Sequence, residues 1–258
     1  MAGHEQVPGG GASPGSPGGS AFLRGSRDGG MTDSVRPGVL EQIRFLHELG
    51  VDALRLPGIP GPAVTATAGA AGPLEAVRRD LGPCTRCALS EGRKNIVFGV
   101  GHPSARLMFI GEGPGEEEDR QGEPFVGRAG KLLDRMIAAI GLSREQVYIA
   151  NIVKCRPPGN RNPHDDEIAT CFGFLVAQIE AIQPRALVAL GKVAASVLLQ
   201  EPIAITRARG QMREFRGIPL MLTFHPAYLL RQYTRQNRQA VYDDLRQVKA
   251  LVDQAGSG

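Results

Sequence analysis

The sequence predicts an α/β protein with a mostly parallel central sheet that is covered by helices on both faces. Short apolar runs alternate along the chain with amphipathic segments of about ten or more residues, which is the pattern of β–α–β units. Glycines stand where predicted helices end, at Gly50, Gly82 and Gly141. With 258 residues the chain is long enough for one domain with a full core and extensions.

The predicted elements follow one another closely. A helix from Leu74 to Leu81 ends at Gly82-Pro83, because proline cannot continue a helix. After it, short apolar runs predict strands, and apolar residues at helical spacing predict the helices between them. The strands are expected at 106–110, 147–150, 186–190 and 218–223, and the helices at 127–140, 165–182, 191–200 and 236–254.

The N-terminal part of the chain is predicted to lie outside this domain. Residues 1–30 are rich in Gly, Pro and Ser and bury too little to offset their ordering entropy, so we expect a disordered tail. Residues 31–72 combine a helix at Leu40–Leu49 with a flexible linker from Pro57 to Gly72. The domain itself is expected at 73–254.

The composition favours a cytoplasmic protein with a polyanionic partner. The formal net charge is +4, and between Ala204 and Arg238 there are seven arginines and one acid. Because a guanidinium matches phosphate oxygens, this stretch suggests phosphate contacts, although a solvated basic face is the alternative. Residues 1–30 contain no secretory signal and the chain contains no apolar run of about 20 residues, so no membrane partner is expected.

The four cysteines of the chain form an ordered set, with Cys84 and Cys87 close together and Cys155 and Cys171 far along the chain. Four thiolates can hold a structural zinc or a [4Fe–4S] cluster. Only one pair is close, which favours the cluster over zinc. Two disulfides would require an oxidising compartment, and unrelated buried thiols would not explain the tight first pair.

Glycine-rich or polar residues follow three of the predicted strands. Gly111–Gly115 follows the first strand, Asn151 the second and His225 the last. Ligands of parallel sheets bind beyond the carboxyl ends of the strands, so these residues are expected to meet at one site. The glycine loop matches neither a Walker loop nor a Rossmann fingerprint.

Each candidate side chain also has an ordinary structural interpretation. Glu112 can position a water molecule, although its loop can be a plain turn. Phe125 offers a ring for a planar ligand or a hydrophobe for the core. Asn151 can bond to the edge of a base or cap a turn. In the proline-rich loop that follows, Asn160 can hold a water and Arg161 can meet a phosphate, unless the loop is only solvated.

His225 stands at a strand end beside the arginine-rich stretch, and Pro226 fixes the turn that follows. A lone histidine is usually structural. The position of this one at the expected ligand edge of the sheet favours a functional role.

Together these stretches resemble the family 4 uracil-DNA glycosylases, the iron–sulfur class of bacteria and archaea. The resemblance runs from Pro73 to the C-terminus, and its motifs are specific in combination although no single motif is. It rests on Gly111-Glu-Gly-Pro-Gly-Glu-Glu-Glu-Asp119, Gly122-Glu-Pro-Phe-Val-Gly127, Asn151-Ile-Val-Lys-Cys-Arg-Pro-Pro158 and His225-Pro-Ala-Tyr-Leu-Leu-Arg231.

The resemblance implies a three-layer α/β/α sandwich with a short, mostly parallel central sheet. The implied reaction is hydrolysis of the N-glycosidic bond of deoxyuridine in uracil-containing DNA, which starts base excision repair. A duplex hides that bond, so the base must first be flipped into a pocket. The protein is expected to be a monomer, with the N-terminal extension as a candidate surface for a repair-protein partner. A [4Fe–4S] cluster with a structural role is implied on Cys84, Cys87, Cys155 and Cys171.

The resemblance also implies roles in binding and releasing the base. Phe125 stacks on the flipped uracil and Asn151 hydrogen-bonds its edge, so that cytosine is refused. The backbone of Gly113 lies against the base. His225 donates a hydrogen bond to O2 as the departing uracil gains negative charge.

The remaining implied roles concern the water molecule and the DNA backbone. Glu112 and Asn160 position the attacking water. Contacts to DNA phosphates are expected from Arg161, Arg207 and Arg231.

Three rival interpretations remain at this level. Relatives that capture the abasic site covalently use a histidine in an inserted loop, whereas this chain has Thr206–Gly210 there and no histidine between His164 and His225. A non-catalytic DNA-binding protein or an iron–sulfur electron carrier would not need the aromatic, amide and imidazole groups at one edge. A fusion domain of a polymerase system is the third, although the chain is too short for a polymerase.

Overall fold

A computed structural model of the chain describes residues 72–254. The expected tail at 1–30, the helix at Leu40–Leu49 and the linker up to residue 71 lie outside the described residues. The division of the chain into tail, linker region and domain therefore stays a prediction. Among the residues that are described, no helix is both long enough and apolar enough to cross a membrane.

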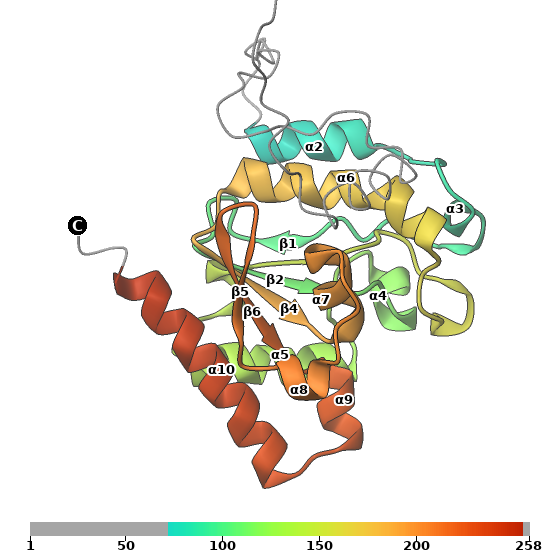
Figure 1. Cartoon of the computed structure of the whole chain (residues 1–258). Coiled ribbons are helices and arrows are strands. Elements are labelled where there is room, and N and C mark those ends of the chain that lie inside the picture. The colour runs from blue at the N-terminus through green and yellow to red at the C-terminus, as the bar shows by residue number, and fades with distance from the viewer. Residues whose placement is uncertain (1–71, 255–258) are drawn as a thin grey trace, which may run out of the picture. The chain divides into compact units, whose positions relative to one another are not determined.

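Six strands form one sheet in the order β1-β3-β2-β4-β6-β5 (Figure 1). The four inner strands are mutually parallel, and the two edge strands pair antiparallel to their neighbours. Parallel neighbours need crossover connections, which the intervening helices supply. The strands are β1 (Val100–Gly101), β2 (Leu107–Gly111), β3 (Tyr148–Asn151), β4 (Ala186–Leu190), β5 (Met212–Phe215) and β6 (Ile218–Thr223).

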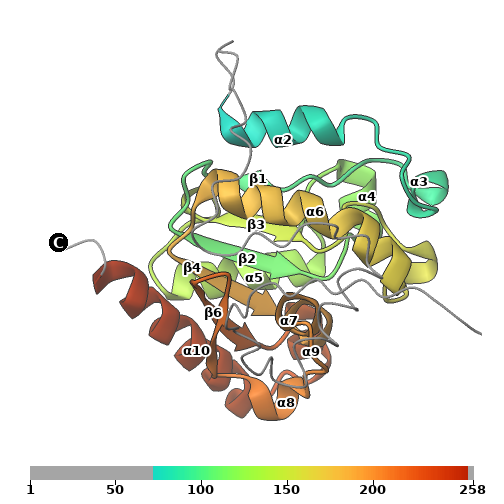
Figure 2. The ribbon, with the colours of Figure 1, turned by 45° about the horizontal axis from the view of Figure 1, so that its top comes forward.

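Helices cover both faces of this sheet. In Figure 2, α2 and α6 lie above the sheet, whereas α5 and α10 lie below it. The longer helices are α2 (Pro73–Leu81), α5 (Arg128–Ala139), α6 (Asp165–Ile182), α7 (Lys192–Leu199) and α10 (Arg235–Gln254). The short ones are α3 (Leu89–Gly92), α4 (Glu116–Gln121), α8 (Ile205–Ala208), α9 (Pro226–Arg231) and the 3₁₀ turns Arg144–Gln146 and Pro158–Asn160.

Two hydrophobic cores result, one on each face. Successive strand residues point to opposite faces, so Met108 and Ile110 of β2 join the core beneath α2, α6 and α7. Leu107 and Phe109 join the core formed with α5, α9 and α10. Strands that are apolar at every position are what a sheet buried on both faces requires. The predicted three-layer α/β/α sandwich is confirmed.

The inner strands and the longer helices begin and end within one residue of the predicted bounds. The sequence does not predict the edge strands or the short helices, for a physical reason. A two-residue strand has no periodicity, and β5 exposes its two central residues, Arg213 and Glu214, so it shows no apolar run. Each short helix is at most six residues long, which is too short for an amphipathic pattern.

The carboxyl ends of the inner strands meet at one edge of the sheet. Gly111 at the end of β2 lies opposite Asn151 at the end of β3, and Leu190 lies opposite Thr223. The helices α4, α7 and α9 begin a few residues beyond β2, β4 and β6, so the connecting loops gather at the same edge. This arrangement brings three separate sequence motifs together.

Candidate active site

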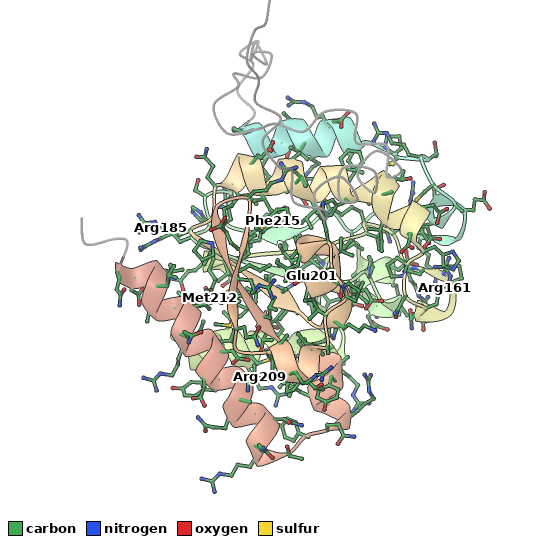
Figure 3. The ribbon with its side chains drawn as sticks, viewed as in Figure 1. Arg161, Arg185, Glu201, Arg209, Met212 and Phe215 are labelled. Carbon is green, nitrogen blue, oxygen red and sulfur yellow. The ribbon has the colours of Figure 1, made fainter. Side chains whose placement is uncertain are left out.

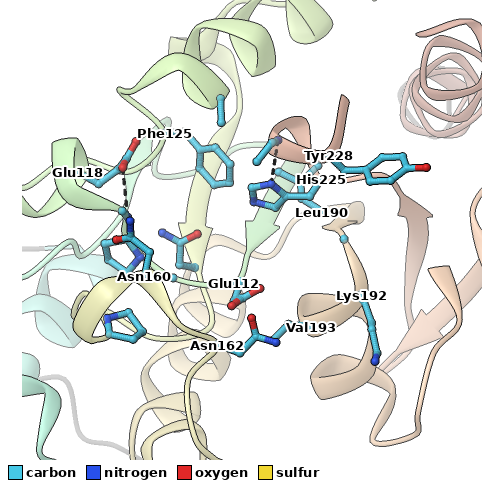
Figure 4. A pocket seen from close by; sticks show the side chains of 18 of the residues that line it. Glu112, Glu118, Phe125, Asn160, Asn162, Leu190, Lys192, Val193, His225 and Tyr228 are labelled. Carbon is cyan, nitrogen blue, oxygen red and sulfur yellow. Dashed lines mark hydrogen bonds between the residues drawn. The ribbon is translucent and has the colours of Figure 1, made fainter. Parts of the chain in front are cut away.

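A cavity of about 600 Å³ opens at this edge of the sheet (Figure 4). It is of the size that small-molecule sites commonly have. Nine residues were predicted from the sequence to bind the base, the water molecule or a phosphate. All of them except Arg207 lie in the wall of this cavity. The predicted residues that line it are Glu112, Gly113, Phe125, Asn151, Asn160, Arg161, His225 and Arg231.

Asn151 provides a hydrogen-bonding group without a protein partner. Its side chain is 1% exposed, and its Oδ1 is the one buried side-chain polar atom among residues 72–254 that has no hydrogen bond. Leaving such an acceptor unpaired costs about 1–3 kcal/mol. A ligand that donates a hydrogen bond to Oδ1 recovers this free energy, so the atom marks a binding position.

Gly111, which the sequence analysis named only as the start of the glycine loop, has a specific role in shaping the site. A Cβ atom at this position would stand 2.4 Å from Oδ1 of Asn151 and 2.5 Å from Cζ of Phe125. Both contacts are far closer than real atoms allow. Any side chain at Gly111 would therefore displace the amide and the ring together, and only the register of β2 against β3 reveals this constraint.

Phe125 lies 6% exposed, between the cavity and the core beneath α5. Both interpretations made from the sequence, a core hydrophobe and a wall of a binding site, thus apply to it. Its backbone has a φ of +53°, which is unusual for a residue with a side chain. Its ring centroid lies 5.6 Å from that of His225, and Figure 4 shows the two rings side by side at the cavity.

Arg144, a charged residue that the sequence analysis missed, holds this strained loop. The guanidinium of Arg144 donates to the backbone oxygens of Pro124 and Phe125 and pairs with Glu123 and Asp134. Arg144 comes from a distant 3₁₀ turn, so no local pattern indicates its role. The ring of Phe125 is thereby fixed before any ligand binds.

Glu118 ties the glycine loop to the Phe125 loop. Its Oε1 accepts hydrogen bonds from the backbone N–H groups of Val126 and Gly127, both at 2.9 Å, and its Oε2 accepts from Gly115 at 3.1 Å. The signal for it was present, because a Glu at the third position of a helix after Gly115 fits a capping arrangement. Only the contact of Glu118 with the Phe125 loop, through Val126 and Gly127, depends on tertiary structure.

The geometry around His225 determines its protonation state. Its Nδ1 accepts a hydrogen bond from the backbone N–H of Ala227 at 3.0 Å, at the start of α9. The ring proton therefore resides on Nε2, which is free to donate. Burial and, to a lesser extent, the positive charge of Arg231 lower the pKa of His225 to about 4. The imidazole is thus a neutral N–H donor at pH 7.

The strand that carries His225 is anchored by a buried carboxylate. Asp244 of α10 is 2% exposed and accepts hydrogen bonds from Oγ1 of Thr223 at 2.7 Å and from Nε of Arg209 at 3.0 Å. On the other side, a Cβ at Gly191 would stand 2.9 Å from Cβ of His225. These contacts fix the backbone from which the imidazole projects.

Glu112 and Asn160 line the cavity from two different loops. Burial raises the pKa of Glu112 above its ordinary value. The Oδ1 of Asn160 accepts a hydrogen bond from Nε of Arg156 at 2.7 Å, which holds the amide in place. Figure 4 shows Glu112 and Asn162 on one side of the cavity and the two rings on the other. The carboxylate of Glu112 and the amide of Asn160, both in the cavity wall, can orient a water molecule.

The arginines divide into two groups. Arg161 forms a double ion pair with buried Glu167, at 2.8 and 2.6 Å, and Arg209 pairs with Asp244. The two lie well apart in the fold (Figure 3). Arg207 is exposed, and Arg231 is exposed at the cavity. The basic stretch therefore contributes partly to the fold, and the guanidinium of Arg161 has a structural partner as well as its predicted phosphate role.

The four cysteines line a second, smaller cavity. All four are free thiols, which removes the disulfide alternative for the described structure. Nη1 of Arg93 donates to Sγ of Cys155 and the backbone N–H of Lys154 donates to Sγ of Cys171, both at 3.3 Å. Donors of this kind stabilise thiolates bound to a metal centre.

Single-ion geometry is not found at this cavity. Within residues 72–254 no group of three or more His, Cys, Asp or Glu side chains is arranged to hold one metal ion. Burial raises the pKa of Cys171 to about 11 and also raises that of Cys155. The convergence of all four thiols on one cavity still argues against unrelated buried cysteines.

Comparison with known proteins places the chain in a family. Residues 98–246 match the family described as the uracil DNA glycosylase superfamily. A type-4 uracil-DNA glycosylase of Thermotoga maritima is 45% identical over 185 residues, which cover 71% of this chain and 96% of the relative. The chain belongs to the type-4 uracil-DNA glycosylase family.

Two further type-4 uracil-DNA glycosylases support this membership. The protein of Archaeoglobus fulgidus is 41% identical over 69% of this chain and 92% of its own length. That of Saccharolobus solfataricus is 43% identical over 69% of this chain and 86% of its own length. The resemblance stated from the motifs is confirmed, and the matched residues of the family include both Asn151 and His225.

We expect His225 to remain neutral, with its proton on Nε2, from pH 7 down to about pH 5. The ordinary pKa of histidine is about 6.5, so the unfolded chain takes up this proton first and the folded protein loses stability as the pH falls from about 6.5 toward 4. Long-range ¹H–¹⁵N spectra of the imidazoles measure both properties. A ring that titrates near pH 6.5, or that carries its proton on Nδ1, contradicts this assignment.

Proposed function

We propose that this protein is a uracil-DNA glycosylase that hydrolyses the N-glycosidic bond of deoxyuridine in DNA and releases free uracil to start base excision repair. The observation that carries the proposal is the buried, unpaired Oδ1 of Asn151 beside the fixed ring of Phe125. A pocket that sets a buried amide beside an aromatic ring is suited to a planar base flipped out of the DNA.

Recognition of uracil follows from the two ends of the Asn151 amide. Oδ1 accepts from N3–H of uracil, and the NH₂ group donates to O4. Cytosine presents an amino group in place of O4 and an acceptor in place of N3–H, so both contacts become repulsive. The ring of Phe125 stacks on the base, and the backbone at Gly113 lies against it.

Release of the base depends on charge that develops on uracil as the bond breaks. Nε2–H of His225 donates to O2, where this charge gathers, and the bond strengthens as the transition state forms. Because the imidazole is neutral beforehand, the site can hold uracil without ionising it. Glu112 and Asn160 orient the water that attacks the sugar carbon.

We propose that the four thiols at the cysteine cavity are the ligands of a [4Fe–4S] cluster. Four thiols are present, Arg86 and Arg93 lie beside them, and N–H groups donate to their sulfur atoms. When bound, such a cluster cross-links chain segments, and the hydrolysis itself requires no electron transfer. Cys84 and Cys87 would be joined to the two ends of the Cys155–Cys171 segment, which carries Asn160 and Arg161 to the cavity.

The same proposal includes the DNA-binding surface. Arg231 is exposed at the cavity, and Arg207 is exposed on α8, whose first residue, Ile205, lines the same cavity. Both are suited to bind phosphates, and Arg161 is a further contact. Such contacts position the duplex without reading its sequence. We further propose a cytoplasmic monomer whose N-terminal extension is available to a repair-protein partner.

Purified protein should release uracil from uracil-containing oligonucleotides and leave thymine-only and cytosine-only ones intact after alkaline cleavage.

Asn151→Asp should reduce uracil release by about 10- to 100-fold, because a carboxylate cannot donate to O4. Asn162→Asp adds the same charge to the same cavity and serves as the matched control. Equal losses in the two variants would assign the effect to charge, and absence of uracil release by the unmodified protein would refute the proposal.

His225→Ala and Arg207→Ala should separate chemistry from DNA binding. Loss of the His225 donor should slow single-turnover release by about 10²–10³-fold with little loss of DNA affinity. Arg207→Ala should weaken binding to all sequences and reduce the salt slope by about 1, at an unchanged rate under saturating protein. The reverse pattern, in single-turnover kinetics and salt titrations, would exchange the two roles.

The anaerobically purified protein should contain about four irons per chain and show broad visible absorbance, as a [4Fe–4S] centre does. Cys171→Ala should lose both signals and lower the unfolding temperature. One zinc per chain without iron would overturn the cluster and leave the glycosylase proposal standing. An iron–sulfur protein that releases no uracil would instead support the electron-carrier alternative.

A further inference from the structure

Lys154 is a buried cation that the proposed reaction does not use. Its side chain is 0% exposed, and no carboxylate of the described residues acts on it. Its ammonium donates to the backbone oxygen of Asn151 at 2.8 Å and to Oε1 of Gln178 at 2.6 Å. Burying an ammonium without a carboxylate is costly, so these two contacts are specific features of the fold.

The two contacts take the place of missing sheet hydrogen bonds. The ladder between β1 and β3 ends at Ile149, so β1 offers no partner to the carbonyl of Asn151. Lys154 donates to that carbonyl. Gln178 of α6 accepts from the same ammonium and donates to the backbone oxygen of Phe98 at 2.9 Å. A side-chain bridge thus continues the pairing beyond the end of the ladder.

The bond from Lys154 to the Asn151 carbonyl bears on the orientation of the Asn151 amide. No described protein group bonds to its Oδ1, so the direction of the side chain follows from its backbone and its packing. On the β2 side, the backbone is held by the hydrogen bond from Ile152 N–H to the oxygen of Gly111 at 2.9 Å. On the other side, among residues 72–254, the group that bonds to its carbonyl is the ammonium of Lys154.

We propose that Lys154 is a positioning residue for uracil recognition, which aims the Asn151 amide by holding its backbone carbonyl. This inference rests on the proposed uracil-DNA glycosylase function. It also connects the two cavities, because the backbone N–H of Lys154 donates to Sγ of Cys171 and the next residue is Cys155. Lys154 therefore lines the cysteine cavity and bonds to Asn151, which lines the base pocket.

A double-mutant cycle of Lys154→Met and Asn151→Ala tests the inference in the full chain. Methionine keeps the length of the side chain and removes its donors. Lys154→Met alone should slow single-turnover uracil release by about 10- to 100-fold, since small displacements of a positioned group have effects of that size. Free uracil should inhibit the variant less strongly by a similar factor. In the Asn151→Ala background, Lys154→Met should cost nothing further.

Readouts other than activity exclude a merely structural role. Iron per chain and affinity for thymine-only duplex should stay unchanged in Lys154→Met. Gln178→Met is the matched control, because it breaks the same buried network and leaves the bond from Lys154 to Asn151. It should lower the unfolding temperature and leave inhibition by uracil unchanged. Where Lys154→Met does not fold, Lys154→Gln, which keeps an N–H donor without the charge, takes its place in the cycle and should show a smaller, equally non-additive loss.

The outcomes are distinguishable. Additive losses in the cycle, or the same change in uracil inhibition in Gln178→Met, overturn the positioning role while the glycosylase function stands. Loss of iron together with additive losses of rate also overturns the positioning role. That result would show that Lys154 stabilises the cysteine site instead. An unmodified protein that releases no uracil refutes the proposed function, and the inference falls with it.

Discussion

The site depends on one constraint, the parallel pairing of β2 with β3 in the register that sets Gly111 opposite Asn151. A shift of one residue would turn the Asn151 side chain to the other face of the sheet. The absence of a side chain at Gly111 leaves room for both the amide and the ring of Phe125. The glycine loop, the Asn151 amide and the ring of Phe125 thus form a single unit.

The structure holds this unit in a state that is unfavourable without a ligand. An unpaired buried acceptor and an aromatic residue at positive φ each cost free energy, of the order of 1–3 kcal/mol. Glu118 and Arg144 offset that cost by binding the backbone of the surrounding loops. Such prior arrangement lets a ligand bind without reorganising the pocket, which is the condition under which fixed dipoles act most strongly on a transition state.

Net charge is an incomplete guide to DNA binding in this protein. Arginines at 144, 161 and 209 bond to carboxylates or backbone oxygens inside the fold, and two more, at 213 and 216, pair with surface glutamates. The arginine-rich stretch therefore mixes structural cations with those available to phosphates. The same preference of the guanidinium for planar, paired oxygen acceptors explains both uses.

The sequence by itself determined the layer architecture, because apolar strands alternating with amphipathic helices have few other ways to bury their faces. It also determined which residues stand at the strand ends, and hence most of the cavity wall. Tertiary structure alone decided the rest. Arg144 bonds to Phe125, Asp244 to Arg209 and Lys154 to Gln178, all on segments distant in the chain, and no local pattern encodes a hydrogen bond between such segments. Strand register likewise decided the role of Gly111, because the requirement for glycine comes from a neighbour forty residues away in sequence, at Asn151.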